Sequence, residues 1–416
     1  MSILSQQKQS VNTDFPNLRP SLDLRFALAK KLDPRITFTR GSSGTYFGPD
    51  GIMRTAGVNE PRFDHDPITG QSLGLLIEES RTNQMVRSDI EGTVGAQPTA
   101  MLLAGPINGQ TAVVSTDVSL GPNGQSCKHT RGAFSDNNIG YMDSGLITAG
   151  QTYVFSAYVY IPSSQAKNFV GKYLRWGMES ANSGFTYATA DVTIVDRWQR
   201  VFGTCVPTGV NAIWVLRTNA NVGSFFYTDC WQLELGSFPT SYMPASGGSQ
   251  FTRNSDFASM TGTNFSSWYN QGEGTILVNL VPNYSNAVAN RFRRYLTISA
   301  GSGQQDNVIQ LISIDNGNQI QFAVWNSNVF QAGANLTVTS GTAGKIGYSI
   351  KQNSCVLAGN GRLLQNDNSC IIPTILNRLD IGGYNATGGY QSTSTISRVT
   401  YYPVALTPTQ LINLTS

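Results

Sequence analysis

Short runs of alternating apolar and polar residues, separated by glycine- and asparagine-rich turns, constrain the fold of this chain most. Residues 152–161 read TYVFSAYVYI, and a period of two predicts a strand with one buried face. Further runs of this kind stand at 197–202, 212–216, 225–235, 274–280, 295–299, 308–314, 319–325, 345–351 and 397–402. Asn-Gly in the turns 315–318 and 359–361 is a hairpin signal. Only residues 407–414 predict a helix, and a short one.

The charged residues favour the same conclusion. They make up 13% of the 416 residues, and the whole chain holds seven Glu. Long amphipathic helices carry Lys and Glu on their exposed faces, so this composition argues against them. Glycine, at 42 residues, suits tight turns between strands. We therefore predict an all-β protein of tandem antiparallel β-sandwiches (jelly rolls), preceded by a short irregular or β N-terminal attachment region.

Breaks in the pattern predict three parts. Residues 1–84 begin as a polar arm and continue as short strands and turns, with turn sequences at Pro49-Asp50-Gly51 and around Asp66-Pro67. Residues 85–248 form one β unit that ends in a Ser-Gly-Gly-Ser linker, and residues 249–416 form another.

Several function classes are disfavoured by charge and hydropathy. The net charge is +3, and the longest basic cluster is residues 291–294, so we expect no nucleic-acid binding. No apolar run approaches the roughly 18 residues of a membrane span, so no membrane insertion is expected. The first 15 residues lack the pattern of a secretory signal, which predicts folding in a cytoplasm.

Cysteines and histidines offer little chemistry. Five cysteines without a Cys-x-x-Cys pair are expected to be buried free thiols. His65, within Asp64-His65-Asp66, is expected in a surface turn, and His129 has no acidic neighbour in the sequence. Glu78 and Glu79 would point to opposite faces of a strand, so they do not form the carboxylate pair of a glycoside hydrolase. We expect no enzyme and no catalytic residue.

Binding of a ligand such as a carbohydrate is the function that these arguments leave open. Most aromatic residues are expected in the core, among them Trp198, Trp214, Trp231 and Trp325, which lie within strand patterns. The rings of Trp268, Tyr269, Tyr384 and Tyr390 lie in C-terminal loops and are expected to be exposed. Together with the amides beside two of them, these rings are the candidate carbohydrate-binding residues: Trp268, Tyr269, Tyr384, Asn385, Tyr390 and Gln391. The alternative is that these residues only cap the sandwich.

Metal binding is a minor expectation. No metal site or cofactor is predicted, although turn oxygens at Asp315-Asn316 and Asp367-Asn368 could hold a structural calcium ion. The alternative for both pairs is an ordinary turn.

One tripeptide recurs. Phe38-Thr39-Arg40 returns as Phe251-Thr252-Arg253. The repeat is either a coincidence or a sign that both segments enter a sandwich in the same way.

The block ITFTRGSSGTYFGPDG…PRFDHDPITG…GLLIEESRTN resembles a head spike or fibre domain found in phage structural proteins, over about residues 20–84. The resemblance implies attachment to a virion, for which the candidate residues are Phe38, Arg40, Tyr46, Arg62, Phe63 and Asp64. The middle part (YVFSAYVYI, DRWQRVFGT, YTDCWQLELGSFPTSYMP) looks like a carbohydrate-binding-module jelly roll. The last part is similar to laminin-G and concanavalin-A-like sandwiches.

These resemblances imply a non-enzymatic bacteriophage surface protein, a head, neck or tail fibre or a decoration protein. It would be made in the host cytoplasm, dock to capsid, collar or tail proteins, and bind host glycan or protein. Such proteins form homo-oligomers, often trimers. The alternatives are a structural cement, collar or tail protein without sugar binding, a polysaccharide depolymerase, and a bacterial surface adhesin.

Overall fold

The computed structural model describes residues 14–99, 101–102, 111–133, 141–142, 147–180, 184–209, 212–283, 292–301, 306–314, 319–384 and 390–416. Over these residues the regular secondary structure consists mainly of antiparallel strands with a few short helices, which confirms the all-β prediction. It forms two compact units. Of the described residues, those within 14–37, 257–283 and 292–416 belong to unit 1, and those within 38–256 belong to unit 2.

Both units draw on the predicted N-terminal region. Residues 14–37 belong with the C-terminal part, and residues 38–84 belong with the middle part. The boundaries predicted at 84/85 and 248/249 stay predictions. No helix in the described ranges has the length and apolar character that a membrane crossing requires.

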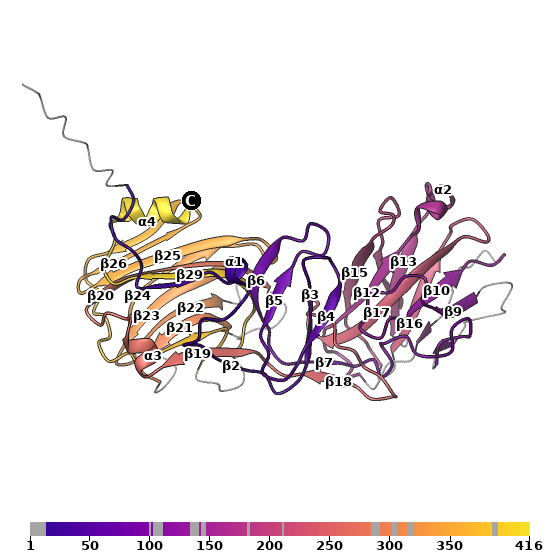
Figure 1. The fold of residues 1–416 in the computed structure, drawn as a ribbon, viewed down its shortest axis with the longest axis horizontal. Helices are drawn as coiled ribbons and strands as arrows, with labels where there is room; N and C mark the ends of the chain where they lie inside the picture. The colour runs from indigo at the N-terminus through magenta and orange to yellow at the C-terminus, as the bar shows by residue number, and fades with distance from the viewer. Residues whose placement is uncertain are drawn as a thin grey trace, which may run out of the picture. The chain divides into compact units, whose positions relative to one another are not determined.

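Unit 1 is a sandwich of two sheets (Figure 1). One sheet has the order β27-β26-β25-β20-β29, with β1 paired to β29, and the other has the order β19-β28-β21-β22-β23-β24. The strands of the first sheet are β1 (Leu22–Leu24), β20 (Glu273–Asn283), β25 (Gly344–Lys351), β26 (Ser354–Gly359), β27 (Arg362–Asp367) and β29 (Thr393–Tyr402). Those of the second are β19 (Phe257–Thr261), β21 (Arg294–Ser299), β22 (Val308–Ile314), β23 (Gln319–Asn326), β24 (Val329–Thr337) and β28 (Arg378–Ile381).

The two sheets of unit 1 pack through inward-facing apolar residues. Phe322 of β23 stacks on Tyr348 of β25, with ring centroids 4.1 Å apart. The helices are α1 (Phe26–Ala29), α3 (Thr263–Ser266) and α4 (Pro408–Thr415). Helix α4 confirms the predicted C-terminal helix and packs against β25 and β26. It begins with a capping box between Thr407 and Gln410.

Unit 2 contains a second sandwich. Its larger sheet has the order β15-β12-β17-β10-β9, and its smaller sheet has the order β14-β13-β16. The strands are β9 (Thr111–Ser115), β10 (Ser126–Thr130), β12 (Tyr153–Tyr160), β13 (Leu174–Ser180), β14 (Gly184–Thr189), β15 (Trp198–Cys205), β16 (Ala212–Thr218) and β17 (Phe225–Leu235). Short helices η1 (Ser163–Gln165) and α2 (Ala166–Phe169) follow β12.

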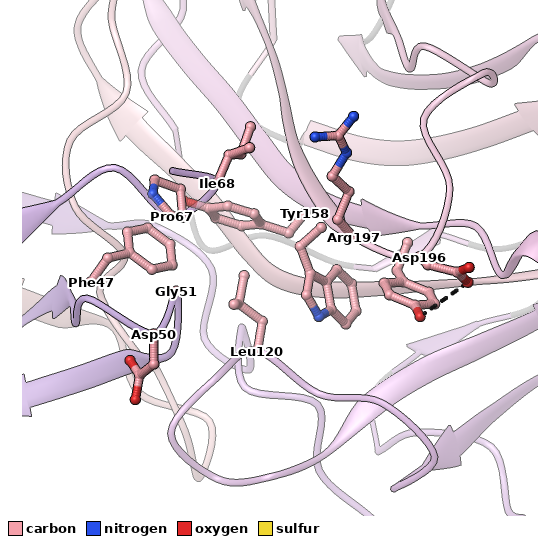
Figure 2. Close-up of a pocket in the computed structure, with 11 residues that line it drawn as sticks. Phe47, Asp50, Gly51, Pro67, Ile68, Leu120, Tyr158, Asp196 and Arg197 are labelled. Carbon is pink, nitrogen blue, oxygen red and sulfur yellow. Dashed lines mark hydrogen bonds between the residues drawn. The ribbon is translucent and has the colours of Figure 1, made fainter. Parts of the chain in front are cut away.

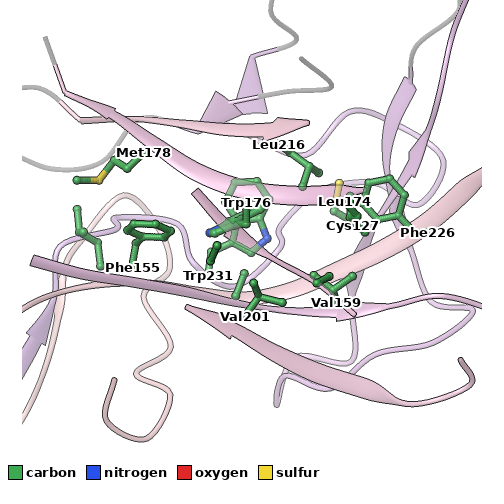
Figure 3. Packing of buried hydrophobic residues seen from close by; sticks show 14 of the residues in the cluster. Cys127, Phe155, Val159, Leu174, Trp176, Met178, Val201, Leu216, Phe226 and Trp231 are labelled. Atoms are coloured by element: carbon green, nitrogen blue, oxygen red, sulfur yellow. The ribbon is translucent and has the colours of Figure 1, made fainter. Parts of the chain in front are cut away.

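The core of this sandwich lies between its two sheets (Figure 3). Trp176 of β13 and Trp231 of β17 meet edge to face, with centroids 4.1 Å apart, and both are fully buried. His129 is also buried here, and its ring stacks on Phe226 at 5.2 Å. Burial lowers the pKa of His129 to about 3, so the ring is neutral.

The remaining strands of unit 2 are short. Hairpins form between β3 (Gly44–Phe47) and β4 (Met53–Ala56), and between β5 (Arg62–His65) and β6 (Ser72–Ile77). β7 (Arg81–Asn83) pairs with β18 (Phe251–Arg253), and β8 (Met101–Leu102) pairs with β11 (Tyr141–Met142). β2 (Thr37–Thr39) lies where the chain passes from one unit to the other.

The cysteine prediction is correct for three of the five residues. Cys127, Cys205 and Cys230 are buried free thiols. Cys355 of β26 and Cys370, which follows β27, form a disulfide across 15 residues of sequence. The expectation of five free thiols is therefore wrong, because the β26–β27 hairpin returns the chain to the same place.

Candidate binding site

The outer face of the larger sheet of unit 2 carries aromatic side chains. Phe155, Ala157 and Val159 of β12 point into the core, so Tyr158 and Tyr160 point outward. Trp198 of β15 lies directly opposite Tyr160 on one side. Tyr227 of β17 lies opposite Tyr160 on the other side. One row of rings thus crosses three neighbouring strands.

The rings of this row differ in accessibility. Trp198 and Tyr160 are half-buried, and their centroids are 5.4 Å apart. Tyr227 is 4% exposed, and its hydroxyl donates to Asp117 at 2.8 Å. The ammonium of Lys128 covers this end of the row, 5.6 Å from the centroid of Tyr227. Trp198 and Tyr160 are therefore the rings of the row that a ligand can reach.

A cavity of about 260 Å³ opens beside these two rings. Tyr158, Trp198 and Leu120 line it from the sandwich, and Phe47 and Ile68 line it from the two hairpins. Figure 2 shows the apolar side chains turned towards one another, with the charged ends of Asp50 and Arg197 at the rim. Its full lining is Phe47, Asp50, Gly51, Pro67, Ile68, Leu120, Tyr158, Tyr160, Asp196, Arg197 and Trp198.

Two predicted turns form one wall of the cavity. Gly51 has φ of +73°, and a Cβ there would lie 2.5 Å from the carbonyl oxygen of Pro67. Gly70 has φ of +69°, and its Cβ would lie 2.5 Å from the carbonyl oxygen of Pro49. Each turn therefore needs glycine for its conformation and for the approach of the other turn.

Phe47 is held in the wall by two consecutive residues of β5. The carboxylate of Asp64 accepts from the Phe47 N–H at 2.8 Å. His65 Nδ1 lies 3.0 Å from the Phe47 carbonyl oxygen, so Nδ1–H donates to it. Burial raises the pKa of Asp64 to about 6. His65 is 3% exposed and lies in a strand, so the expectation of a surface turn is wrong.

The rim of the cavity carries two carboxyl groups, those of Asp50 and Asp196. Asp196 Oδ1 accepts from the Ser163 N–H at 2.8 Å and from the Tyr160 hydroxyl at 3.4 Å. Hydrogen bonds from Ser163 lower the pKa of Asp196. The Ile52 N–H and Arg54 lower the pKa of Asp50. Both carboxyl groups are ionised at neutral pH and can accept hydrogen bonds from a ligand.

The candidate sugar-binding residues of the C-terminal part lie elsewhere, in unit 1. Trp268 is 4% exposed, and its ring centroid lies 5.0 Å from that of Tyr401. Tyr269 is half-buried in the same group of rings. The expectation that Trp268 is exposed is wrong, because helix α3 folds the ring onto Phe265 and Tyr401.

The second group of candidates surrounds an arginine. The guanidinium of Arg294 lies 4.3 Å from the centroid of Tyr384 and 5.2 Å from that of Tyr390. Tyr384 is 4% exposed, so its expected exposure is also wrong, while Tyr390 is half-buried. Gln391 is buried, and Asn385 lies outside the described residues. Sugar binding by these residues stays a prediction.

Two of the candidate attachment residues belong to a buried arginine–carboxylate cluster, which consists of Arg40, Arg62, Glu78, Arg253 and Asp256. Asp256 pairs with Arg40 at 2.9 Å and with Arg62. Glu78 pairs with Arg62 at 2.7 Å and with Arg253 at 3.1 Å. All five side chains are at most 2% exposed.

Both copies of the repeated tripeptide contribute to this cluster. Arg40 and Arg253 end the two copies, and each is paired with one of the two carboxylates. Burial alone would raise the pKa of Glu78, but Arg253 and Arg62 lower it to about 2. Among the other attachment candidates, Phe38 is buried and Tyr46, Phe63 and Asp64 are half-buried. Their role in attachment stays a prediction.

Sequence reasoning missed the cavity although its signal was present. Outward and inward positions of β12 are both aromatic, so the pattern did not distinguish Tyr158 and Tyr160 from core residues. Trp231 is in the core as predicted, but Trp198 lies outside it, at the cavity. Trp325 is half-buried against Phe330, and the side chain of Trp214 lies outside the described residues.

No group of three or more metal-ligating side chains occurs in the described part of the chain. Asp367 Oδ1 accepts from the N–H and hydroxyl of Ser369, as in an ordinary turn. Asp315-Asn316 lies outside the described residues. A calcium site is therefore not supported at Asp367-Asn368.

Comparisons with known proteins give distant likenesses. No family model matches the chain, and no curated protein matches it. The carbohydrate-binding module CBM40 of the Ruminococcus gnavus IT-sialidase, solved with α2,3-sialyllactose, is 18% identical with a TM-score of 0.31. That match covers 37% of this chain and 87% of the module.

Two further structures show likenesses of similar size. A leech intramolecular trans-sialidase is 18% identical, with a TM-score of 0.31, over 36% of this chain and 24% of the enzyme. A SAP-like pentraxin from Limulus polyphemus is 10% identical, with a TM-score of 0.27, over 35% of this chain and 70% of the pentraxin. TM-scores this low give no evidence about the function of this chain.

Proposed function

We propose that unit 2 binds carbohydrate in the cavity beside Trp198. The observation that carries this proposal is the composition of the cavity: accessible rings of Trp198 and Tyr160 beside ionised Asp50 and Asp196. A sugar has an apolar face that packs on an aromatic ring and hydroxyl groups that donate to carboxylates. A mostly apolar pocket with a few polar groups at its edge meets both needs.

The same groups favour binding without cleavage. Glycoside hydrolysis needs one protonated carboxyl group as general acid, with a raised pKa. The pKa values of Asp50 and Asp196 are both lowered, so neither carries a proton to donate at neutral pH. We therefore propose an adhesion protein rather than a depolymerase.

We further propose that the chain is a phage surface protein, a fibre or decoration protein, with other virion proteins as partners. This proposal rests on the resemblance of residues 20–84 to phage spike and fibre domains. A single shallow sugar site binds weakly, and a homo-oligomer such as a trimer would multiply it. The rival is a structural cement, collar or tail protein without sugar binding, in which aromatic residues of the C-terminal loops would lie at contacts with other proteins.

A glycan array with the full chain tests sugar binding. We expect wild type to bind one class of glycan, and Trp198→Ala to lose at least tenfold in affinity. Phe202→Ala is the matched control, because Phe202 is an exposed ring on the same strand and does not line the cavity. Equal binding by wild type and Trp198→Ala, or no binding to any glycan, would overturn the proposal.

Two further measurements separate the rivals. Incubation of the bound polysaccharide with the purified protein should release no new reducing ends, whereas their appearance would favour a depolymerase. Labelling of purified phage particles with antibodies against the chain should place it on the particle surface. Absence from the particle would exclude the virion assignment.

A further inference from the structure

Unit 1 has a polar hollow of about 420 Å³ at one edge of its sandwich. The edge strands β24 and β27 of the two sheets meet there, and the β26–β27 hairpin turns beside it. The lining residues are Asn335, Leu336, Thr337, Gly359, Asn360, Arg362 and Leu364.

Close packing forms the floor of the hollow. A Cβ at Gly359 would lie 2.6 Å from Leu336 Cδ2, so the glycine lets β24 approach β26. The hairpin register pairs Gly359 with Arg362. Asn360 and Gly361 are its two turn residues, both with positive φ, as in a tight hairpin. The side chains at the rim are thus carried by a well-defined turn.

The polar groups of the hollow are arranged as donors. Asn360 Oδ1 already accepts from the Lys345 N–H at 2.9 Å, which leaves the Asn360 amide NH₂ to donate. Asn335 Oδ1 accepts from Gln321 Nε2 at 3.2 Å, which leaves the Asn335 amide NH₂ to donate as well. Both side chains can therefore bind an acceptor.

The charge of the hollow is positive. Arg362 is exposed and has no carboxylate within 4.0 Å in the part of the chain that the structure describes. No Asp or Glu lines the hollow. The neighbouring Lys345 is occupied, because its ammonium donates to a backbone oxygen of Ser416. One guanidinium without a counter-charge and two amide donors favour an anion.

We propose that this hollow binds a carboxylate anion, with Arg362 as the ion-pairing residue and Asn360 as a donor. The planar guanidinium matches a carboxylate through two parallel hydrogen bonds. The hollow lies in unit 1 and shares no residue with the cavity beside Trp198. Anion binding in the hollow is therefore independent of sugar binding in the cavity, and each can be tested without the other.

Titration of the isotope-labelled full chain with sodium glucuronate tests this site by NMR. Glucose at the same concentration is the uncharged control, inorganic phosphate is the second anion, and ionic strength is held constant. We expect saturable shifts of the Asn360 side-chain amide with glucuronate and none with glucose. Arg362→Gln should weaken binding at least tenfold, and Arg362→Lys should weaken it less.

Two matched variants complete the test. Arg175→Gln removes an exposed arginine of unit 2 and should leave the titration unchanged. Trp198→Ala should also leave it unchanged. The proposal is overturned if glucuronate produces no saturable shift or if a folded Arg362→Gln binds as wild type does. Binding of phosphate without binding of glucuronate would overturn the assignment of a carboxylate as the ligand.

Discussion

At the scale of single residues, the arginine–carboxylate cluster shows what a short motif can and cannot predict. Phe-Thr-Arg is visible twice in the sequence, but its two arginines are 213 positions apart. Only the fold reveals that Arg40 pairs with Asp256 and Arg253 with Glu78. Arg62 pairs with both carboxylates and so joins the two pairs. A buried arginine without a carboxylate costs much free energy. The cluster therefore fixes how residues 38–84 and 240–256 pack within unit 2.

Asp256→Asn tests the cluster. The change leaves Arg40 and Arg62 buried with one carboxylate fewer, so we expect a loss of about 3–5 kcal/mol in the free energy of unfolding. Urea unfolding of both proteins measures it. Arg54→Gln is the control, because the Arg54–Asp50 pair is exposed to solvent and should contribute little to stability. A loss for Asp256→Asn as small as that of the control would show that the cluster adds little stability.

Asp64 gives a prediction about pH. Its pKa is about 6 in the folded chain and lies near 3.8 without burial, so the folded state holds the proton more tightly. Its contribution to stability is therefore fully present below about pH 4 and is lost as pH rises through about 6, by up to roughly 3 kcal/mol.

Asp64→Asn removes this titration and keeps an acceptor for the Phe47 N–H. We expect the variant to have a higher free energy of unfolding than wild type at pH 7.5, and the difference to shrink towards zero at pH 4.5. Urea unfolding at the two pH values measures it. The pKa of Asp89 is also raised to about 6. Its titration changes the stability of wild type and variant equally, so it does not affect the difference between them. Asp66→Asn should show the opposite sign, because the pKa of Asp66 is lowered by hydrogen bonds from Thr69. A pH-independent difference between wild type and Asp64→Asn would contradict the account.

At the scale of elements, the positions of the strands were predictable from the sequence, but which face of each strand is buried was not. Alternation located β12, β15, β17 and the six strands predicted in the C-terminal part, because burial of one face imposes a period of two. It could not say which face of β12 meets the second sheet, since both faces carry aromatic residues. Trp198 was therefore placed in the core, and the cavity beside it was missed.

The two turns of the cavity wall give a prediction for Gly51→Ala. The added Cβ would meet the Pro67 carbonyl oxygen, so we expect loss of stability and weaker glycan binding. Gly124→Ala is the matched control, because Gly124 has a similar φ of +72° with no atom within 4 Å. The control should lose only the roughly 1–2 kcal/mol of the left-handed conformation. Equal losses in both variants would show that the contact between the turns is unimportant.

The disulfide of unit 1 also acts at this scale. Cys355–Cys370 closes a loop of 15 residues, which corresponds to about 3 kcal/mol of stability in the chain-entropy account. We expect dithiothreitol to lower the unfolding midpoint of unit 1 in wild type and to leave Cys355→Ala/Cys370→Ala unchanged. A reductant effect of equal size in the double variant would show that the effect does not come from this disulfide.

At the scale of the whole molecule, the sequence order of the segments does not match the order of the units. β1 pairs with β29, so Leu22–Leu24 joins strands that follow it by more than 370 residues. No local pattern predicts such a pairing, because alternation shows that a segment is a strand but not which strand it joins. For the same reason the cavity, formed by residues 47–68, 120 and 158–198, could not be assembled from the sequence.

The central claim is that sugar binds beside Trp198. The chain has six tryptophans, and the indole N–H signal of each can be followed by NMR as the glycan selected on the array is added. The account predicts a saturable shift of the Trp198 signal, while the buried Trp176 and Trp231 stay unchanged. A shift of Trp268 without one of Trp198, or no shift of any tryptophan while the glycan binds, would contradict it.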